Sequence, residues 1–287
     1  MKHAYLILAH SSKILLQELI EALDDKRNDI YVHLDKKAKF DIGDITVKYS
    51  NLYILSERRD ARWGDYSLVE VEFLLMSEAS SRFSYAYYHF LSGVDFPIAS
   101  QNVIHDFFNH HKGKEFIGFA NHTPRAELEW RSQHYFLFSR NFNTKNLFIR
   151  VVRRIFADIQ TLLGYKRYPK EIKKGCQWCS ITNDFVEYLL SHEFIINKYF
   201  NHTYCPDELV IQTLCWNSSF RDRVYNLHDE FRGCLRYINW DNGIIHLMDN
   251  EDPRRMVESE FLFARKFSEE GLVNISKIKK IYNSKQV

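Results

Sequence analysis

Hydrophobic residues near the start of the chain follow two alternating patterns. Residues 4–9 form a continuous apolar run, which is typical of a strand that is buried on both faces. Residues 13–25 then place Leu and Ile side chains at helical spacing, and residues 30–35 form a second strand that ends in a carboxylate. This order predicts two parallel strands joined by a helix in a right-handed crossover.

The same alternation continues along the following residues. We expect further strands at 45–47, 52–55, 85–91 and 115–119, and helices at 68–79 and 103–109. Together they predict an α/β fold with a Rossmann-like, open, mixed sheet flanked by helices. Such sheets bind ligands beyond the carboxyl ends of their strands, where His10 and Asp35 stand. Both residue types also suit an ordinary loop or turn.

The remaining residues are less regular in pattern. We expect strands at 135–138, 175–182 and 235–240, helices at 183–192, 207–216 and from Asp252-Pro253 onward, and a basic, peripheral tail from Ser276. No Pro/Gly-rich linker and no repeat interrupts the chain. We therefore expect residues 1–287 to form one domain.

A long amphipathic stripe occupies residues 145–163. Its apolar residues recur at helical spacing, with Lys145, Arg150, Arg153 and Arg154 beside them and a run of basic residues from 166 to 174 after them. One interpretation is a helix whose apolar face packs on the core. The other is an interfacial helix that makes peripheral contact with an anionic membrane through residues 145–174.

The segment Pro206-Asp207-Glu208 precedes the apolar residues of the expected helix 207–216. Proline suits the first helical position, and acidic side chains suit the positive end of a helix dipole. Asp207 and Glu208 therefore fit a capping role. A carboxylate held rigidly at the edge of a packed body also fits a general base.

Composition narrows the class of protein. The 287 residues carry a net charge of +2, which argues against a dedicated nucleic-acid binder. The 22 Phe, 17 Tyr and 5 Trp suit either a core or stacking on sugars. Five cysteines do not suggest a disulfide framework, and the isolated pair Cys176 and Cys179 is a weak metal or redox signal. The N-terminal run lacks the features of a signal peptide, so we expect a cytoplasmic location.

Six motifs in order resemble the core 2 / I-branching β-1,6-N-acetylglucosaminyltransferases, which share a family with the peptide O-xylosyltransferases. They are His33-Leu34-Asp35-Lys36-Lys37, Arg62-Trp63-Gly64 with Ser67-Leu68-Val69, residues 91–98, Gly175-Cys176-Gln177-Trp178, Pro206-Asp207-Glu208 and residues 262–267. The resemblance implies a GT-A-type fold and inverting transfer from a UDP-sugar without a metal ion. It also implies a nucleotide-binding half at 1–120 and an acceptor or catalytic half at 121–287. The chain contains no Asp-x-Asp triplet; its nearest approach lies at 249–252.

The resemblance also assigns roles to single residues. Glu208 matches the catalytic base, with Asp207 capping and orienting the turn, while Arg265 and Lys266 match the cations that stabilise the departing UDP. Further donor contacts fall on Ala9, His10, Asp35, Arg62, Trp63, Gln177, Trp178 and Arg236. Acceptor contacts fall on Asp95, Glu129, Arg131 and Tyr204.

The implied reaction moves a sugar to a hydroxyl group of a glycan or glycolipid. UDP-N-acetylglucosamine is the leading donor and UDP-xylose the second. Without an apparent membrane anchor, the chain is similar to a short bacterial member that builds a surface polysaccharide, in the cytoplasm or at the inner face of the membrane. The alternative is a catalytically silent glycan-binding or assembly subunit that keeps the fold.

Overall fold

A central five-stranded sheet organises the protein, for which a computed structural model describes residues 1–241 and 244–284. The strand order is β3-β2-β1-β4-β6. The strands are β1 (His3–Ala9), β2 (Asn28–Leu34), β3 (Asn51–Ile54), β4 (Tyr87–Ser92) and β6 (Ser180–Thr182). The first four are parallel and β6 is antiparallel to β4, which confirms the mixed α/β sheet expected from the sequence.

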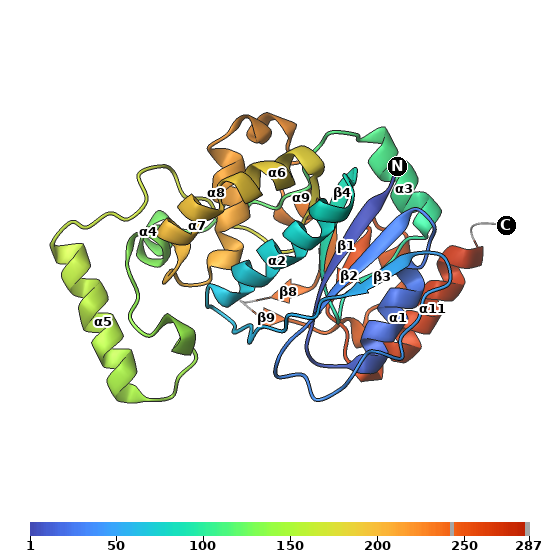
Figure 1. Ribbon diagram of the computed structural model, residues 1–287, viewed down its shortest axis with the longest axis horizontal. Coiled ribbons are helices and arrows are strands. Elements are labelled where there is room, and N and C mark those ends of the chain that lie inside the picture. The colour runs from blue at the N-terminus through green and yellow to red at the C-terminus, as the bar shows by residue number, and fades with distance from the viewer. Residues whose placement is uncertain (242–243, 285–287) are drawn as a thin grey trace.

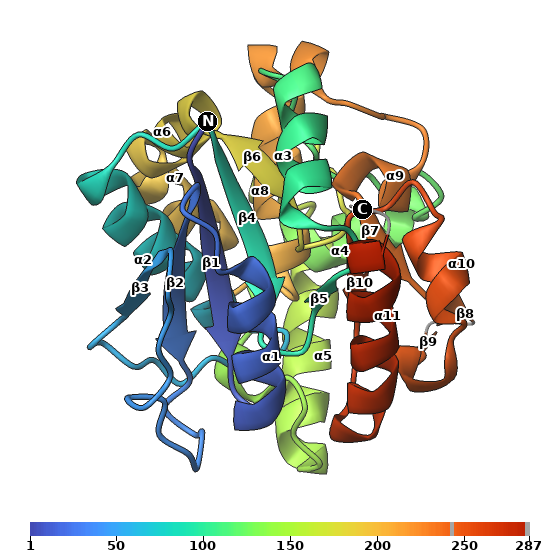
Figure 2. The same ribbon diagram turned by 90° about the vertical axis from the view of Figure 1, so that its right-hand side faces the viewer.

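Helices cover both faces of this sheet (Figures 1 and 2). The helices are α1 (Lys13–Leu23) and α3 (Gln101–His110) on one face, and α2 (Ser67–Arg82) and α6 (Asn183–Ser191) on the other. Tyr5 and Ile7 of β1 pack on the side of α1 and α3, while Leu6 and Leu8 pack on the side of α2. Burial on both faces explains why β1 reads as a continuous apolar run.

A second, three-stranded sheet lies beyond the central one. It comprises β5 (Phe96–Pro97), β10 (Phe263–Arg265) and β7 (Arg236–Ile238), in the order β5-β10-β7. The helices α10 (Pro253–Val257) and α11 (Leu272–Ser284) pack beside it. Asp252 caps α10, and Pro253 takes its first position, as expected. The expectation that the residues from Ser276 onward form a peripheral tail is wrong for residues 276–284, because Ile278 in α11 is buried. Residues 285–287 lie outside the described residues.

Other short elements surround these sheets. They are α4 (Arg125–Gln133), α5 (Leu147–Leu162), α7 (Glu193–Phe200), α8 (Val210–Trp216), α9 (Glu230–Cys234), β8 (Trp240–Asp241), β9 (Ile244–Ile245) and the 3-10 turns η1 (Ser139–Asn141), η2 (Pro206–Glu208), η3 (Ser219–Arg223), η4 (Met248–Asn250) and η5 (Glu269–Gly271). In Figure 1, α5 projects at the end of the molecule opposite α11.

Several expected strands are loops in the structure. Residues 45–47 and 135–138 form no strand, residues 115–119 contribute only isolated bridges at Glu115 and Phe116, and the strand expected at 175–182 is limited to β6. Phe116, Ile117 and Phe119 are nevertheless buried. An apolar run thus indicated burial correctly, but it does not distinguish a strand from a buried loop.

The amphipathic helix was predicted correctly, and the structure contradicts one of the two interpretations of its apolar face. Helix α5 exists, but the interpretation that its apolar face packs on the core is wrong. Leu147, Phe148, Ile155 and Leu162 are exposed, and the buried side chains of α5 are Arg153, Ala157 and Gln160. No helix among the described residues combines the length and apolarity needed to span a bilayer.

Candidate active site

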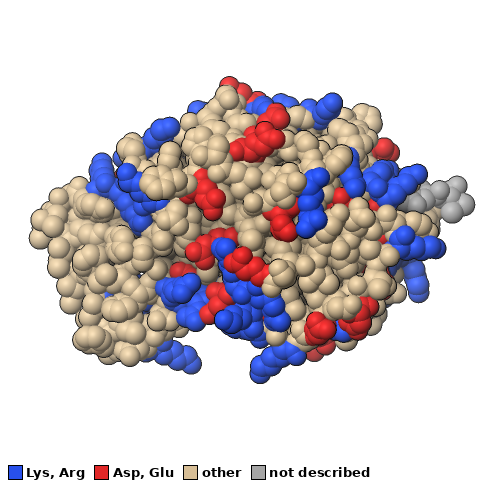
Figure 3. Space-filling model, in the orientation of Figure 1, with Lys and Arg blue, Asp and Glu red and all other residues tan. Residues whose placement is uncertain are grey.

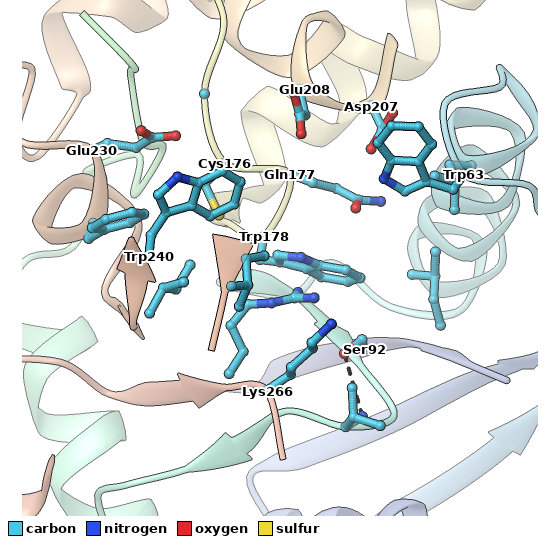
Figure 4. A pocket seen from close by; sticks show the side chains of 18 of the residues that line it. Trp63, Ser92, Cys176, Gln177, Trp178, Asp207, Glu208, Glu230, Trp240 and Lys266 are labelled. Atoms are coloured by element: carbon cyan, nitrogen blue, oxygen red, sulfur yellow. Dashed lines mark hydrogen bonds between the residues drawn. The ribbon is translucent and has the colours of Figure 1, made fainter. Parts of the chain in front are cut away.

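A cavity of about 1220 Å³ opens at the carboxyl ends of β1, β2 and β4. Residues from both 1–120 and 121–287 line it. Nine of the predicted site residues are among them: Ala9, His10, Asp35, Trp63, Gln177, Trp178, Glu208, Arg265 and Lys266. Figure 4 shows Glu208 on one side of this cavity and Lys266 on the opposite side, with Trp178 and Gln177 between them. The structure therefore brings the predicted base and the predicted cations into one space.

Glu208 ends the turn η2, which is anchored at the edge of the buried helix α8. Its Oε2 lies 2.7 Å from Arg131 Nη2 and 3.9 Å from Lys174 Nζ. Its side chain is 30% exposed, and Oε1 has no hydrogen-bond partner within the described ranges. The carboxylate is thus fixed by two cations through one oxygen, and the other oxygen can accept a proton from an incoming hydroxyl.

Asp207 has a different environment from its neighbour. Burial, together with the charge of Glu208, raises the pKa of Asp207 to about 7. Its Oδ1 is buried and has no partner in the part of the chain that the structure describes. The expected capping role is wrong, because no side chain caps η2 and the α-helix itself begins only at Val210. Both carboxyl groups line the cavity, but Asp207 is buried there whereas the side chain of Glu208 is partly exposed.

We expect Asp207→Asn to stabilise the protein increasingly as the pH rises. The folded state raises the pKa of Asp207 from an ordinary 3.8 to about 7. The neutral carboxyl group therefore contributes stability to the folded state that is fully present below pH 3.8 and is lost as the pH rises through 7. Asn mimics the neutral form at every pH. The gain in free energy of unfolding should grow between about pH 4 and pH 8, to at most about 4 kcal/mol.

Urea denaturation at both pH values measures this difference. The exposed Asp222, changed to Asn, is the matched control and should show little dependence on pH. A stability difference for Asp207→Asn that is the same at both pH values would contradict the protonation state inferred for this side chain.

Two adjacent cations at the end of β10 form the other side of the cavity. The guanidinium carbon of Arg265 lies 4.3 Å from the centre of the Trp178 ring, and Arg265 Nη1 lies 3.6 Å from Asp95 Oδ1. Asp95 is itself held by the backbone N–H and the hydroxyl of Ser92, at 2.8 and 2.7 Å. Lys266 makes no ion pair with any acidic side chain in the described ranges and points into the cavity (Figure 4). The pair can receive an anionic group.

The residues that follow the first two strands, His10 and Asp35, both line the cavity. Asp35 accepts hydrogen bonds from the backbone N–H groups of Lys37 and Ala61, at 2.7 and 3.0 Å. Burial lowers the pKa of His10, and the nearby cations Lys37, Lys266 and Arg265 act in the same direction, against the opposite effect of Asp35. A neutral His10 ring offers one donor and one acceptor to a ligand.

Arg236 does not reach the cavity. It is fully buried and donates to the carbonyl oxygens of Cys234, Phe90 and Cys179 at 2.6 to 3.1 Å. Its guanidinium group therefore holds loops and strand ends together, and the expectation of a donor contact is wrong. The strand pattern placed it on β7 without showing which way its side chain points.

The expected acceptor residues also lie outside the cavity lining. Glu129 is exposed and pairs with Arg125 at 2.8 Å on the surface of α4. Arg131 is buried and holds Glu208, while Tyr204 supports Arg131 through its carbonyl oxygen and ring. Asp95 is buried beneath Arg265. None of the four lines the cavity, so the structure does not support direct contact with an acceptor at these positions, and Arg131 and Asp95 instead position other site residues.

Arg62 occupies a neighbouring groove. It pairs with Asp60 at 2.6 Å and lines a second hollow with Arg140 and residues 141–144. Lys37 and Trp63 line both the groove and the main cavity, so these two side chains border both spaces. Arg62 therefore lies in the groove and not in the main cavity, and its donor contact stays a prediction.

Among the cavity residues that sequence reasoning missed, three stand out for their charge or ring: Lys174, Glu230 and Trp240. Lys174 approaches Glu208, but it belonged to a basic run that was interpreted as a membrane flank. Glu230 and Trp240 come from α9 and β8, and no motif pointed to them. Burial raises the pKa of Glu230 to about 7 despite the opposing charge of Lys174. A raised carboxyl pKa in a cavity is a feature of functional sites, but only the fold reveals it.

No three His, Cys, Asp or Glu side chains among residues 1–241 and 244–284 are grouped so that they could hold a metal ion. Asp249, in the nearest approach to an Asp-x-Asp triplet, accepts hydrogen bonds from the backbone N–H and hydroxyl of Ser268, at 2.9 and 2.6 Å. It therefore supports the turn after β10. Catalysis without a metal ion stays a prediction.

Comparisons with known proteins agree with the resemblance found in the sequence. Xylosyltransferase sqv-6 of Caenorhabditis briggsae is 25% identical over 222 residues, which are 73% of this chain and 25% of that protein. Xylosyltransferase 1 of Rattus norvegicus is 22% identical over 256 residues, which are 84% and 28% of the respective chains. The chain thus spans about a quarter of the length of the curated relatives it matches.

Two solved structures show a distant likeness. S. aureus TarS has a TM-score of 0.37 at 12% identity and covers 98% of this chain and 65% of its own. Mouse xyloside xylosyltransferase 1 in its apo form has a TM-score of 0.35 at 10% identity, and the match covers 91% of this chain and 96% of the mouse chain. Both likenesses are too distant to carry weight on function.

A family model, "Core-2/I-Branching enzyme", matches residues 3–275, which is nearly the whole chain. This match covers both the sheet that forms the floor of the cavity and the segments that carry Glu208, Arg265 and Lys266. The two curated relatives described above are named xylosyltransferases, and the chain belongs to the Core-2/I-Branching enzyme family.

Proposed function

We propose that this protein is an inverting glycosyltransferase that moves a sugar from a UDP-sugar to a hydroxyl group of a glycan or glycolipid. The observation that carries the proposal is the placement of Glu208 and the pair Arg265 and Lys266 on opposite sides of one cavity. Inversion needs a base on the face of the sugar opposite the leaving group, and this placement provides one.

The reaction follows from the charges of these residues. Glu208 takes the proton of the acceptor hydroxyl as its oxygen attacks the anomeric carbon of the sugar. The bond to the diphosphate breaks, and the negative charge that develops on UDP is stabilised by Arg265 and Lys266. Asp95 and Trp178 hold Arg265 in place before the reaction, so little reorganisation is needed.

The donor sugar is proposed from the family and its relatives. N-acetylglucosamine, β-linked, is the first candidate, from the resemblance to the core 2 / I-branching β-1,6-N-acetylglucosaminyltransferases. UDP-xylose is the second candidate, because the relatives described above are named xylosyltransferases. A cytoplasmic site of action and a role in polysaccharide synthesis belong to the same proposal. So does contact with the inner face of a membrane through residues 145–174.

We expect the purified protein to release UDP slowly from its donor without any acceptor, and to do so equally well in EDTA. A cavity lined by two adjacent cations can stabilise the diphosphate without a divalent ion. Both expectations, slow UDP release without an acceptor and its insensitivity to EDTA, are checked by measuring UDP release from UDP-N-acetylglucosamine and from UDP-xylose, with and without EDTA.

Each outcome of this assay has a separate meaning. Loss of UDP release in EDTA that manganese restores would contradict the metal-free mechanism. Binding of glycans with no UDP release from either donor would instead favour the catalytically silent subunit. A thermal-shift panel of nucleotide sugars identifies the donor, because a ligand that binds the native state raises its melting temperature.

A further inference from the structure

Helix α5 is packed with its polar face toward the protein. Arg153 donates hydrogen bonds to the carbonyl oxygens of Leu137, Phe142 and Asn141, at 2.8 to 3.3 Å. Gln160 donates to the carbonyl oxygen of Tyr135 at 3.0 Å and accepts from its N–H at 2.8 Å. These directional contacts fix the rotation of α5 about its axis, so its apolar face cannot turn inward without breaking them.

The opposite face of α5 is apolar and exposed over its whole length. Its side chains are between 46% and 86% exposed: Leu147, Phe148, Val151, Ile155, Ile159, Leu162 and Leu163. A helix of 16 residues is about 24 Å long, so this is a continuous stripe and not a scatter of single residues. In Figure 3 the end of the molecule that carries α5 in Figure 1 is largely free of charged atoms.

The charges around the stripe are mainly positive. Lys145, Arg150 and Arg154 are exposed on or just before the helix, and Lys166 and Lys170 follow it. The acidic residue of α5, Asp158, is paired with Arg154 at 3.0 Å. Two copies of this surface would bring the same cations together, whereas an anionic lipid surface would neutralise them.

We propose that α5 lies in the surface of an anionic lipid bilayer, with its apolar stripe among the acyl chains and its flanking cations at the headgroups. A strong separation of apolar and cationic faces on a helix that does not span the bilayer is the pattern of an interfacial helix. The tertiary structure supplies the decisive observation, since the polar face is already occupied by contacts within the protein.

The position of α5 relative to the cavity gives this docking a consequence. Residues 140–144, which lead directly into α5, line the groove that shares Lys37 and Trp63 with the main cavity. A bilayer at α5 therefore brings the lipid surface near the groove that borders the cavity. Where the proposed transfer reaction holds, this favours an acceptor carried by the membrane.

The experiment is co-sedimentation with vesicles of phosphatidylcholine, with and without phosphatidylglycerol. The full chain should bind the anionic vesicles and bind neutral ones weakly, and added salt should reduce binding. The double variant Phe148→Ser with Leu162→Ser should bind the anionic vesicles at least about tenfold more weakly. Both side chains are exposed, so folding should be unaffected.

The matched control is Val103→Ser with Val273→Ser, which removes two exposed apolar side chains from α3 and α11 at the other end of the molecule and should bind like the wild type. Equal binding to neutral and anionic vesicles, no binding to either, or unchanged binding of the α5 variant would overturn the proposal. The proposal would also be overturned if the wild type were a dimer in solution and the α5 variant, but not the control variant, were a monomer. That result would show that the stripe binds a second copy of this chain. Because vesicle binding is measured without turnover, none of these results bears on the transfer reaction.

Discussion

Glu208→Gln should reduce the rate of sugar transfer by about 10²- to 10⁴-fold while leaving the affinity for UDP within about threefold of the wild type. The amide has nearly the same volume and can still accept a hydrogen bond from Arg131, which approaches Glu208 Oε2 at 2.7 Å. It cannot take a proton from the acceptor hydroxyl. Transfer rates at saturating donor and UDP binding by calorimetry provide the two measurements.

The matched control for this variant is Glu129→Gln. Glu129 is an exposed carboxylate outside the cavity, paired with Arg125, and its loss should change transfer little. Thermal unfolding checks that Glu208→Gln remains folded, since Glu127 still lies 3.4 Å from Arg131 and keeps a counter-charge near it. Near-wild-type turnover of Glu208→Gln would remove this residue from the mechanism.

Lys266→Met should reduce transfer by about 10²- to 10³-fold, with a smaller loss of UDP affinity. The ammonium group meets charge that develops on the diphosphate as the glycosidic bond breaks, so its removal affects the transition state more than the bound donor. Lys266 is the better target of the two cations. Arg265 also lies 3.6 Å from the buried carboxylate of Asp95, and removing it would combine a structural defect with the catalytic one.

The control for this second variant is Lys277→Met, which removes an exposed cation from the surface of α11. Comparing kcat with the dissociation constant of UDP separates a transition-state effect from a general loss of donor binding. Transfer by Lys266→Met within about threefold of the wild type would show that this side chain contributes no electrostatic stabilisation. An equal loss in both quantities would limit its role to holding the donor.

The raised pKa values in the cavity belong to the same electrostatic arrangement. Burial raises the pKa of Asp207 and of Glu230 to about 7, and the charge of Glu208 acts in the same direction on both. A partly protonated carboxyl group can donate a hydrogen bond that a carboxylate cannot. The neighbours of Glu208 are therefore sensitive to pH near neutrality.

The elements that could be predicted best from the sequence are the strands that are buried on both faces. β1 and β2 are covered on both faces, and their continuous apolar runs identified them within two residues. Residues 115–119 show the limit of this reasoning, because Phe116 and Phe119 are buried in a loop. Apolar side chains record that a segment is buried, but the hydrogen-bond partners of its backbone are supplied by other parts of the chain.

In the candidate site, too, the sequence predicted some features and only the structure revealed others. Order and spacing of motifs found Glu208, Arg265 and Lys266, which line one cavity. The assignment of Arg236 to a donor contact was wrong, because its place on a strand does not fix the direction of its side chain, which is fully buried. Lys174 and Glu230 were missed because their importance arises from proximity in space.

The sequence by itself determined the parallel βα arrangement, the family and the identity of the three charged residues proposed for catalysis, because these depend on local periodicity and on short motifs. Only the tertiary structure decided which face of α5 meets solvent, and that Asp207 is buried while the adjacent Glu208 stays partly exposed in the cavity. The reason is physical: periodicity defines a polar and an apolar face, but which face is buried depends on partners such as the carbonyl groups that Arg153 binds. Those partners are fixed by contacts between segments that are distant in the chain.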